Sequence, residues 1–204
     1  MAELEVTEQK PLRLFIAIPL PEGVKREIEA AQTELRSLLQ QSRVSWTRPE
    51  QFHLTLRFLG KVEAERLTAL IDVMREVCNG FAALNLVAKD IGCFPNLRRP
   101  RVIWVRVEDT ATQMVRLQQR IQAATQPFTS EEPAEKFHGH VTLGRAREIG
   151  LKESKLLAER AAAMEGRIFG EWPAVEVEIL KSELSPHGAR HGCIASIPLR
   201  EKQG

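Results

Sequence analysis

The sequence predicts a duplicated α+β fold. Short apolar, β-branched runs typical of strands alternate with stretches whose apolar residues recur every three or four positions, as in amphipathic helices. The order strand, helix, strand, helix, strand occurs twice along the chain. A four-residue pattern also occurs twice, as His53-Leu54-Thr55-Leu56 and as His140-Val141-Thr142-Leu143, separated by close to half of the 204 residues. We therefore expect two similar halves that share one sheet or cleft.

The first half contains four predicted strands or extended segments and two predicted helices. Apolar density and β-branched residues predict a strand over 12–18, which Pro19 and Pro21 end. Apolar residues at helical spacing predict helices from 24 to about 41 and over 67–77, the second closed by Asn79-Gly80. The remaining extended segments are 44–46, the first motif strand at 53–60, and 83–91. Alternation along the motif strand predicts that Phe58 is buried with the motif leucines.

Residues 92–101 are rich in turn formers and arginine, which predicts a loop between the halves. Strands then follow over 102–107, from 140 to about 145, over 175–179 and over 193–199, with a turn at 185–188. Residues 110–113 fit a capping box that opens a helix with Met114, Leu117, Ile121 and Ala124 on its inner face. A last helix over 152–164 is predicted to bury Leu156 and Ala163, and residues 127–135 form a loop.

These elements predict one domain over residues 11–204. Its two pseudo-symmetric lobes would span about 11–100 and 101–200, with exchange of strands between them left open, after a flexible segment at 1–10.

The composition limits the functions to consider. With 43% hydrophobic and 27% charged residues the chain can bury a full core, and its net charge of +2 excludes a generally basic nucleic-acid coat. The three cysteines are widely spaced and odd in number, which favours reduced thiols over a disulfide framework. The acidic start is not a signal peptide, and no apolar run approaches the ~20 residues of a membrane span. We expect a cytoplasmic monomer without a membrane partner.

Each motif places two kinds of side chain on opposite faces of its strand. Alternation puts His53 and Thr55 on one face and the leucines on the other, and His140 and Thr142 follow the same pattern. A pair of imidazoles can supply one proton acceptor and one donor near neutral pH, which phosphodiester hydrolysis needs. The threonine hydroxyls suit non-bridging phosphoryl oxygens.

Arginines near the motifs are candidates for the same phosphoryl oxygens. Arg57 keeps the phase of His53 and Thr55 in a regular strand. Arg145 falls out of the corresponding phase unless the strand bends at Gly144.

The motif strands and the residues around them resemble the 2H phosphoesterases. The resemblance lies in His-Leu-Thr-Leu-Arg-Phe-Leu-Gly at 53–60 and in Phe-His-Gly-His-Val-Thr-Leu-Gly-Arg at 137–145. It extends to residues 13–18, 44–49, 92–95 and 99–104, and so covers nearly the whole chain. The sequence is most similar to the LigT-like RNA 2′,3′-cyclic phosphodiesterase branch, once called 2′-5′ RNA ligases.

This resemblance implies a bilobed fold of two antiparallel sheets around a central cleft, with helices outside. It also implies metal-independent opening of an RNA 2′,3′-cyclic phosphate to a 2′-phosphate, without a cofactor. His53 would be the proton donor and His140 the proton acceptor, with Thr55 and Thr142 beside them. Residues expected to bind the RNA or a related cyclic nucleotide are Arg57, Arg145, Phe15, Trp46, Phe94 and Arg99. Two departures from the family pattern are Gly139, where proline is usual, and His191-Gly192-Cys193-Ile194, where an aromatic residue is usual.

Three alternatives remain open from the sequence. His53, His138 and His140 could ligate a zinc ion that activates water, and the effect of a chelator on activity would decide. The arginines at 98, 99 and 101, with Trp46 or Phe94 stacking on a base, could form a non-catalytic RNA-binding module. The same groups could also join a cyclic phosphate to a 5′-hydroxyl, the reverse reaction. Finally, His187 and His191 surround a predicted turn and are expected to be exposed.

Overall fold

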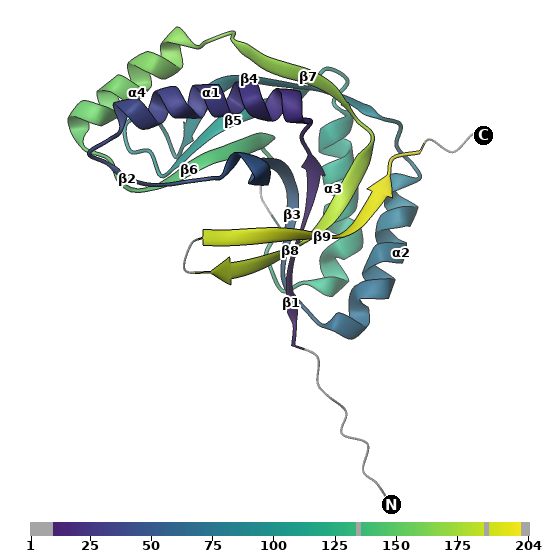
Figure 1. Cartoon of the computed structure of the whole chain (residues 1–204). Coiled ribbons are helices and arrows are strands. Elements are labelled where there is room, and N and C mark those ends of the chain that lie inside the picture. Colours follow the sequence, from purple (N-terminus) through teal and green to yellow (C-terminus); the bar gives the residue numbers. More distant parts are fainter. Residues whose placement is uncertain (1–9, 134–135, 186–187, 201–204) are drawn as a thin grey trace, which may run out of the picture.

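The computed structural model describes residues 10–133, 136–185 and 188–200, which form one curled antiparallel sheet with helices outside it (Figure 1). The strands are β1 (Leu12–Pro19), β2 (Arg43–Trp46), β3 (His53–Val62), β4 (Leu84–Phe94), β5 (Val102–Asp109), β6 (His140–Glu148), β7 (Ile168–Ala174), β8 (Glu176–Ser185) and β9 (Gly188–Pro198). The α-helices are α1 (Glu22–Leu38), α2 (Leu67–Cys78), α3 (Gln113–Thr125) and α4 (Leu151–Ala163). Short 3₁₀ turns lie at 49–51, 64–66 and 126–128.

The sheet has two parts that meet between the motif strands. One part has the order β3-β1-β8-β9, and the other has the order β7-β4-β5-β6 with β2 added to β6. The pair Leu54–Val141 connects β3 to β6. The predicted α+β fold with antiparallel strands and helices outside is therefore confirmed, and the two expected sheets are the two parts of one continuous sheet. Each part of the sheet takes strands from both halves of the sequence.

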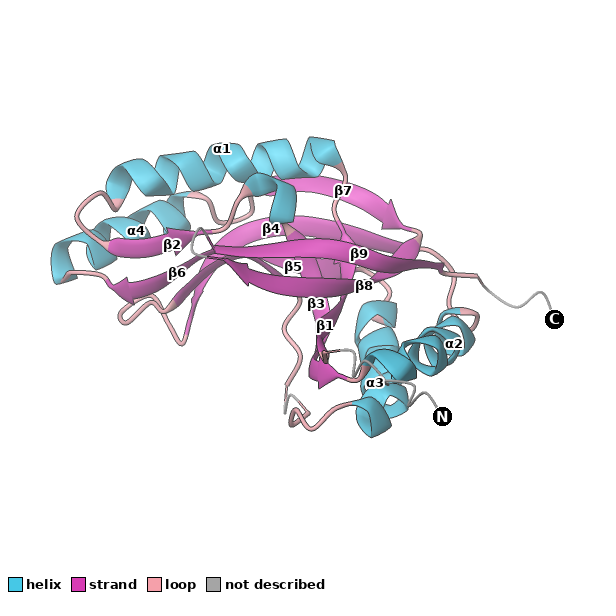
Figure 2. Ribbon diagram, turned by 60° about the horizontal axis from the view of Figure 1, so that its bottom comes forward, coloured by secondary structure: helices cyan, strands magenta, loops and turns pink. Residues whose placement is uncertain are grey.

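The helices cover the convex side of the sheet and leave its concave side open. α1 packs against β7 and α4, while α2 and α3 pack against each other and contact β9 and β3 respectively (Figures 1 and 2). The apolar faces of α1 and α3 explain this packing, since Val24, Ile28 and Leu35 on α1 and Leu117 and Ile121 on α3 are buried in the main core. A separate small cluster, Phe15, Ala17 and Leu180, lies on the other face of the sheet.

Both motif strands contain a β-bulge at the fourth residue of the motif. On β3, Thr55 pairs with Ala17 and Arg57 with Ile16, so Leu56 is the extra residue. On β6, Thr142 pairs with Trp104 and Gly144 with Ile103, so Leu143 is the extra residue. A bulge moves the side chains that follow it to the opposite face from simple alternation.

The bulge on β3 overturns two expectations. Phe58 was expected in the core but is 54% exposed, because the extra residue turns it to the concave face. Arg57 was expected beside His53 but is 5% exposed and turned away from that face. The bulge on β6 has the converse effect, since the exposed Arg145 now lies on the concave side.

Other expected elements differ in detail. Strand β7 was missed, because Gly170 and Pro173 interrupt any regular alternation between Ile168 and Ala174. The expected burial of Leu156 and Ala163 on α4 is wrong: its buried residues are Glu153, Ser154, Leu157 and Ala161. Glu153 is anchored by accepting hydrogen bonds from the Gln41 amide at 2.9 Å and from the Ser42 hydroxyl.

The expected capping box at 110–113 is also wrong. Thr112 precedes α3 with a left-handed φ of 56° and makes no side-chain cap. Instead the Asp109 carboxylate accepts hydrogen bonds from the amides of Met114 at 2.8 Å and Ala111 at 3.0 Å. A carboxylate can cap a helix start as a hydroxyl does.

Three further expectations concern the cysteines, the turn at 185–188 and membrane-spanning helices. The described cysteines are free thiols, with Cys78 and Cys93 buried and Cys193 exposed. Part of the predicted turn at 185–188, including His187, lies outside the described residues. In the described part of the chain no helix is long and apolar enough to cross a membrane.

Candidate active site

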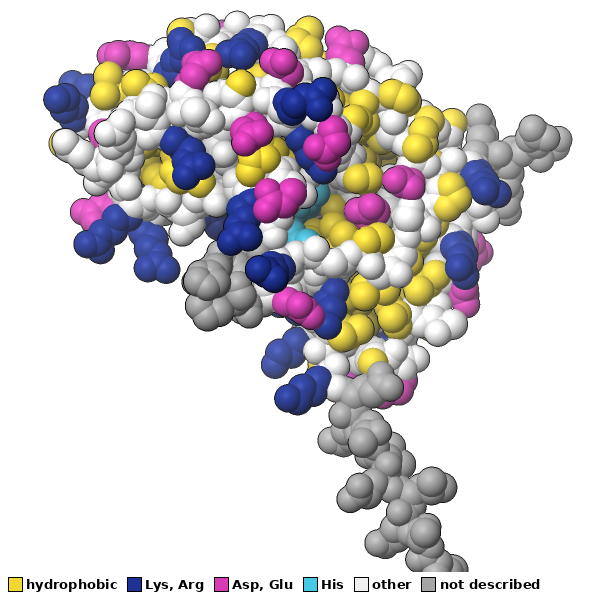
Figure 3. Space-filling view, in the orientation of Figure 1, with side chains coloured by type: hydrophobic (Ala, Val, Ile, Leu, Met, Phe, Trp, Pro, Cys, Tyr) yellow, Lys and Arg dark blue, Asp and Glu magenta, His cyan; other side chains and the backbone are white. Residues whose placement is uncertain are grey.

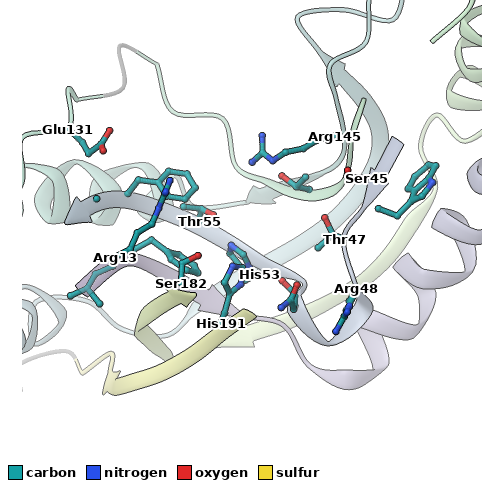
Figure 4. Close-up of a pocket in the computed structure, with 17 residues that line it drawn as sticks. Arg13, Ser45, Thr47, Arg48, His53, Thr55, Glu131, Arg145, Ser182 and His191 are labelled. Carbon is teal, nitrogen blue, oxygen red and sulfur yellow. Dashed lines mark hydrogen bonds between the residues drawn. The ribbon is translucent and has the colours of Figure 1, made fainter. Parts of the chain in front are cut away.

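A cavity of about 540 Å³ opens on the concave side of the sheet, where its two parts meet. Figure 3 shows histidine atoms recessed between basic, acidic and hydrophobic side chains on this face. Its wall contains His53, Thr55, Thr142 and Arg145, together with Phe15, Phe58, Trp46, His191 and several polar groups (Figure 4). The basic lining residues are Arg13, Arg48 and Arg145, and the acidic one is Glu131.

His53 is fixed at the start of β3 by a hydrogen bond to the chain just before it. Its Nδ1 lies 2.7 Å from the carbonyl oxygen of Gln51. A carbonyl only accepts, so Nδ1 carries the hydrogen and the neutral ring has its lone pair on Nε2.

His140 repeats this arrangement at the start of β6. Its Nδ1 lies 2.7 Å from the carbonyl oxygen of His138, again two residues earlier in the chain. Both motif histidines are therefore held as the same tautomer, with Nε2 left for a proton transfer.

The pairing of β3 with β6 brings the two motifs together. Leu54 pairs with Val141 in antiparallel register. His53 and Thr142 are therefore neighbours across the two strands at one end of this pair, and Thr55 and His140 are neighbours at the other end. The two sheet parts thus contribute one imidazole and one hydroxyl each.

A smaller cavity of about 330 Å³ adjoins the first. Thr55, Phe58 and Glu131 line both cavities, whereas His140 and Phe94 line the smaller one. The rings of Phe94 and His140 meet edge to face with centroids 5.1 Å apart. The cleft therefore has a larger compartment beside His53 and a smaller one beside His140.

Burial and positive neighbours oppose protonation of both motif histidines. Burial, with smaller effects of His191, His140 and Arg145, lowers the pKa of His53 to about 4 despite the hydrogen bond to Gln51. Burial, followed by Arg145 and His138, also lowers the pKa of His140. In the free protein both imidazoles are neutral at pH 7, and an anion between them would favour the charged form.

Arg57 does not share the face of His53. Its guanidinium donates hydrogen bonds to the carbonyl oxygens of Glu131 at 2.8 Å and Glu132 at 3.1 Å, and to the Gln126 side chain at 3.2 Å. These contacts tie the 126–132 loop to β3 beside the smaller cavity. The predicted orientation is corrected by the bulge at Leu56, and we do not place Arg57 among the phosphate-binding groups.

The other predicted binding residues are divided among three locations. Phe15, 2% exposed, and the half-buried Trp46 line the larger cavity, and Phe94 lines the smaller one. Arg99 is exposed outside both cavity walls, and its amide donates to the Asn96 side chain at 3.1 Å.

Several cavity residues were missed from the sequence. His191 lies in β9 beside His53, whereas the sequence predicted it near an exposed turn. Arg13 occupies the polar phase of β1 between Leu12 and Leu14, and Ser45 and Thr47 flank Trp46. Such alternation could have suggested these three positions, but not that they face the same cavity as the motifs. In the described ranges, no three His, Cys, Asp or Glu side chains form a group that could hold a metal ion.

Comparisons with known proteins agree with this fold and these motifs. Residues 18–104 match the family model of LigT like phosphoesterases. A Thermus thermophilus RNA 2′,3′-cyclic phosphodiesterase is 30% identical over 200 residues, covering 95% of this chain and 93% of the relative. One from Methanothermobacter thermautotrophicus is 29% identical over 177 residues, covering 87% and 93%.

Solved structures show the same fold. The crystal structure of a Thermus thermophilus protein superimposes with a TM-score of 0.72 at 27% identity, covering 94% of this chain and all of the other. Apo LigT from E. coli gives a TM-score of 0.71 at 22% identity, covering 95% of this chain and 100% of that one.

The curled sheet with one His-x-Thr pair from each part defines the class of two-histidine phosphoesterases. Within that class, this chain belongs to the LigT-like phosphoesterases, and its general activity is phosphodiester hydrolysis.

Proposed function

We propose that this enzyme opens the 2′,3′-cyclic phosphate at the 3′ end of RNA to give a 2′-phosphate. The observation that carries the proposal is the matched pair of imidazoles, each held through Nδ1 by a carbonyl two residues earlier. The relatives named for this activity support the choice of substrate.

His140 and His53 would divide the proton transfers. Nε2 of His140 takes a proton from water, whose oxygen attacks phosphorus and forms the new P–O bond. The bond from phosphorus to the 3′ oxygen breaks on the opposite side, and Nε2–H of His53 gives its proton to that oxygen. Acid–base groups of this kind typically contribute about 10²–10⁴-fold each.

The anionic substrate explains how His53 can act as the acid. Its pKa is about 4 in the free protein, so it is neutral at pH 7. A phosphate anion stabilises the imidazolium form and raises the pKa of His53 when it binds. Thr55, Thr142 and Arg145 line the same cavity and would donate to the non-bridging oxygens.

The direct test is incubation of an RNA ending in a 2′,3′-cyclic phosphate with the protein in the presence of EDTA. We expect a 2′-phosphate product, identified by its migration and by resistance to 3′-specific phosphatase. A 3′-phosphate product, or loss of activity restored by a divalent metal, would contradict the proposed mechanism. Tight binding of the RNA without turnover would favour a non-catalytic RNA-binding module.

A second candidate reaction is favoured by the smaller cavity. A space of about 330 Å³ beside His140 exceeds what one attacking water needs, and it could admit an alcohol such as an RNA 5′-hydroxyl. The same assay with an added 5′-hydroxyl oligonucleotide tests for a 2′-5′ joined product. Water at ~55 M favours hydrolysis unless the acceptor is held in place.

We also propose that the enzyme acts as a monomer, because one chain supplies both imidazoles. Activity that falls on dilution, together with a larger species in light scattering, would contradict this.

A further inference from the structure

A third imidazole lies in the larger cavity beside His53. His191 is on β9, opposite Ser182 of β8, and both residues line the cavity wall. Figure 4 shows the His53 and His191 side chains next to each other. The mechanism proposed above gives His191 no role, although its ring is in contact with that of His53.

His53, His191 and Phe15 form a compact cluster of three rings. The centroids of His53 and His191 are 5.2 Å apart with the rings at 79°, and those of Phe15 and His191 are 4.8 Å apart at 72°. Phe15 completes the cluster at 4.9 Å from His53. His53 is therefore packed on two sides, since β1 contributes one ring and β9 the other.

His191 differs from the motif histidines in how it is held. Its Nδ1 is buried and has no hydrogen-bond partner among the described residues, whereas His53 and His140 each bond a carbonyl. The His191 ring is held by contacts with the Phe15 and His53 rings, and its Nδ1 forms no hydrogen bond with the described residues. The hydrogen bond from His53 Nδ1 to the Gln51 carbonyl does not fix how far the His53 ring tilts about that bond. The neighbouring rings must therefore restrict this tilt.

We propose that His191 is a positioning residue that acts through His53, by packing against its ring so that Nε2 stays directed at the phosphorus-bound leaving oxygen. This inference rests on the proposed function for its kinetic consequences, but the ring cluster exists without substrate. It also gives β9, from the far end of the chain, a direct part in the site.

The charges around the cluster add a second consequence. The charged and titratable groups that face this cavity or act on His53 are Arg13, Arg48, Glu131, His140 and Arg145. Burial lowers the pKa of His191, and the positive form of either His53 or His191 disfavours that of the other. Replacing His191 by an uncharged ring therefore removes one source of repulsion and raises the pKa of His53.

The kinetic test compares His191→Ala with His191→Phe. We expect His191→Ala to lower kcat roughly tenfold or more with little change in KM, because a misdirected acid slows the chemical step. His191→Phe restores ring packing, so it should recover most of the lost kcat. It should also shift the alkaline limb of the kcat pH profile upwards, because activity is lost there when His53 in the complex gives up its proton. Arg190→Ala is the control, since Arg190 is an exposed neighbour on the same strand outside the cavity wall.

A ligand-free measurement separates this inference from the proposed function. NMR titration of labelled histidines, with His53 assigned by His53→Asn, should give a higher His53 pKa in His191→Phe than in the unchanged protein. If the cyclic phosphate is not hydrolysed at all, the proposed function fails while this titration still tests the cluster. An unchanged His53 titration with an unchanged kcat in His191→Ala overturns the inference, as does an increase confined to KM, which would make His191 a substrate contact.

Discussion

Leu54 of β3 pairs with Val141 of β6, and this pair joins the two parts of the sheet. Because each residue directly follows a motif histidine, the pair also sets the separation of the two imidazoles. The core packing of Leu54 and Val141, both fully buried, is thereby connected to the geometry of the cleft.

Substitution of either motif histidine by asparagine should remove activity while keeping its local anchor. The asparagine amide can still donate to the carbonyl of Gln51 or His138, but nothing replaces Nε2 in the cleft. We expect kcat/KM to fall by about 10²–10⁴-fold for His53→Asn and for His140→Asn. Steady-state kinetics at several pH values, with melting temperature as the fold control, would check this; full activity in either variant would rule out the two-histidine mechanism.

Anion binding should take up a proton at His53. Its pKa is about 4 in the free protein, and a bound anion raises it, so affinity is highest at low pH and falls as pH rises towards the pKa of the complex. The fall can approach tenfold per pH unit. Sulfate, which does not titrate in this range, is a suitable probe by calorimetry in buffers of different ionisation enthalpy. A sulfate affinity with the same pH dependence in His53→Asn would show that another group takes up the proton.

Arg145 and Arg57 should affect different properties. Arg145 lines the cavity, so Arg145→Ala should lower kcat/KM by about tenfold to a hundredfold through loss of a charge-assisted hydrogen bond. Arg57→Met removes three hydrogen bonds to the 126–132 loop and should lower the free energy of unfolding by about 1.5–3 kcal/mol. Denaturant unfolding and steady-state kinetics of both variants separate the catalytic role of Arg145 from the structural role of Arg57. A stability loss in Arg145→Ala together with an activity loss confined to Arg57→Met would mean that the bulge assignments are wrong.

The motif threonines should act through their hydroxyl groups. Valine has the shape of threonine without the donor, so Thr55→Val and Thr142→Val should each lower kcat by about 10²-fold if the hydroxyl bonds the transition state. Melting temperatures should change little, because both positions are only partly buried. A loss seen only in KM would instead indicate ground-state binding.

Gly139 should tolerate no side chain. A Cβ there would lie 2.6 Å from the Val107 carbonyl oxygen and 2.8 Å from Met114 Cε, so the backbone that presents the His138 carbonyl must move. We expect Gly139→Ala to lower kcat and the melting temperature together. Gly150→Ala is the matched control, because nothing lies within 4 Å of the position that its Cβ would take and its φ is −68°.

The motifs could be found from sequence because their chemistry and their strand period agree. His53, Thr55, His140 and Thr142 alternate with residues of the core, so the pattern itself showed one apolar and one functional face. The bulges at Leu56 and Leu143 could not be found in this way, since a bulge depends on the pairing strand rather than on local composition. That is why Arg57 and Phe58 were assigned to the wrong faces.

His191 illustrates a second limit of the sequence. Its role depends on β9 folding back along β8, which pairs with β1 and so brings it to Phe15 and His53. No local pattern around residue 191 contains that distant pairing. The capping of α3 by Asp109 rather than by Thr110 is a smaller case, because the carboxylate that binds the Met114 amide lies one residue before the expected capping box.

The interleaving of strands has a consequence for biosynthesis. β1 leaves the ribosome well before β8, with which it pairs on one edge, and β2 leaves before its partner β6. Neither part of the sheet can form completely from the first hundred residues, so β1 and β2 keep unpaired strand edges until β8 and β6 have been made. Truncation from the C-terminal end should therefore abolish folding of the first-synthesised part as well, rather than leave behind a stable N-terminal unit.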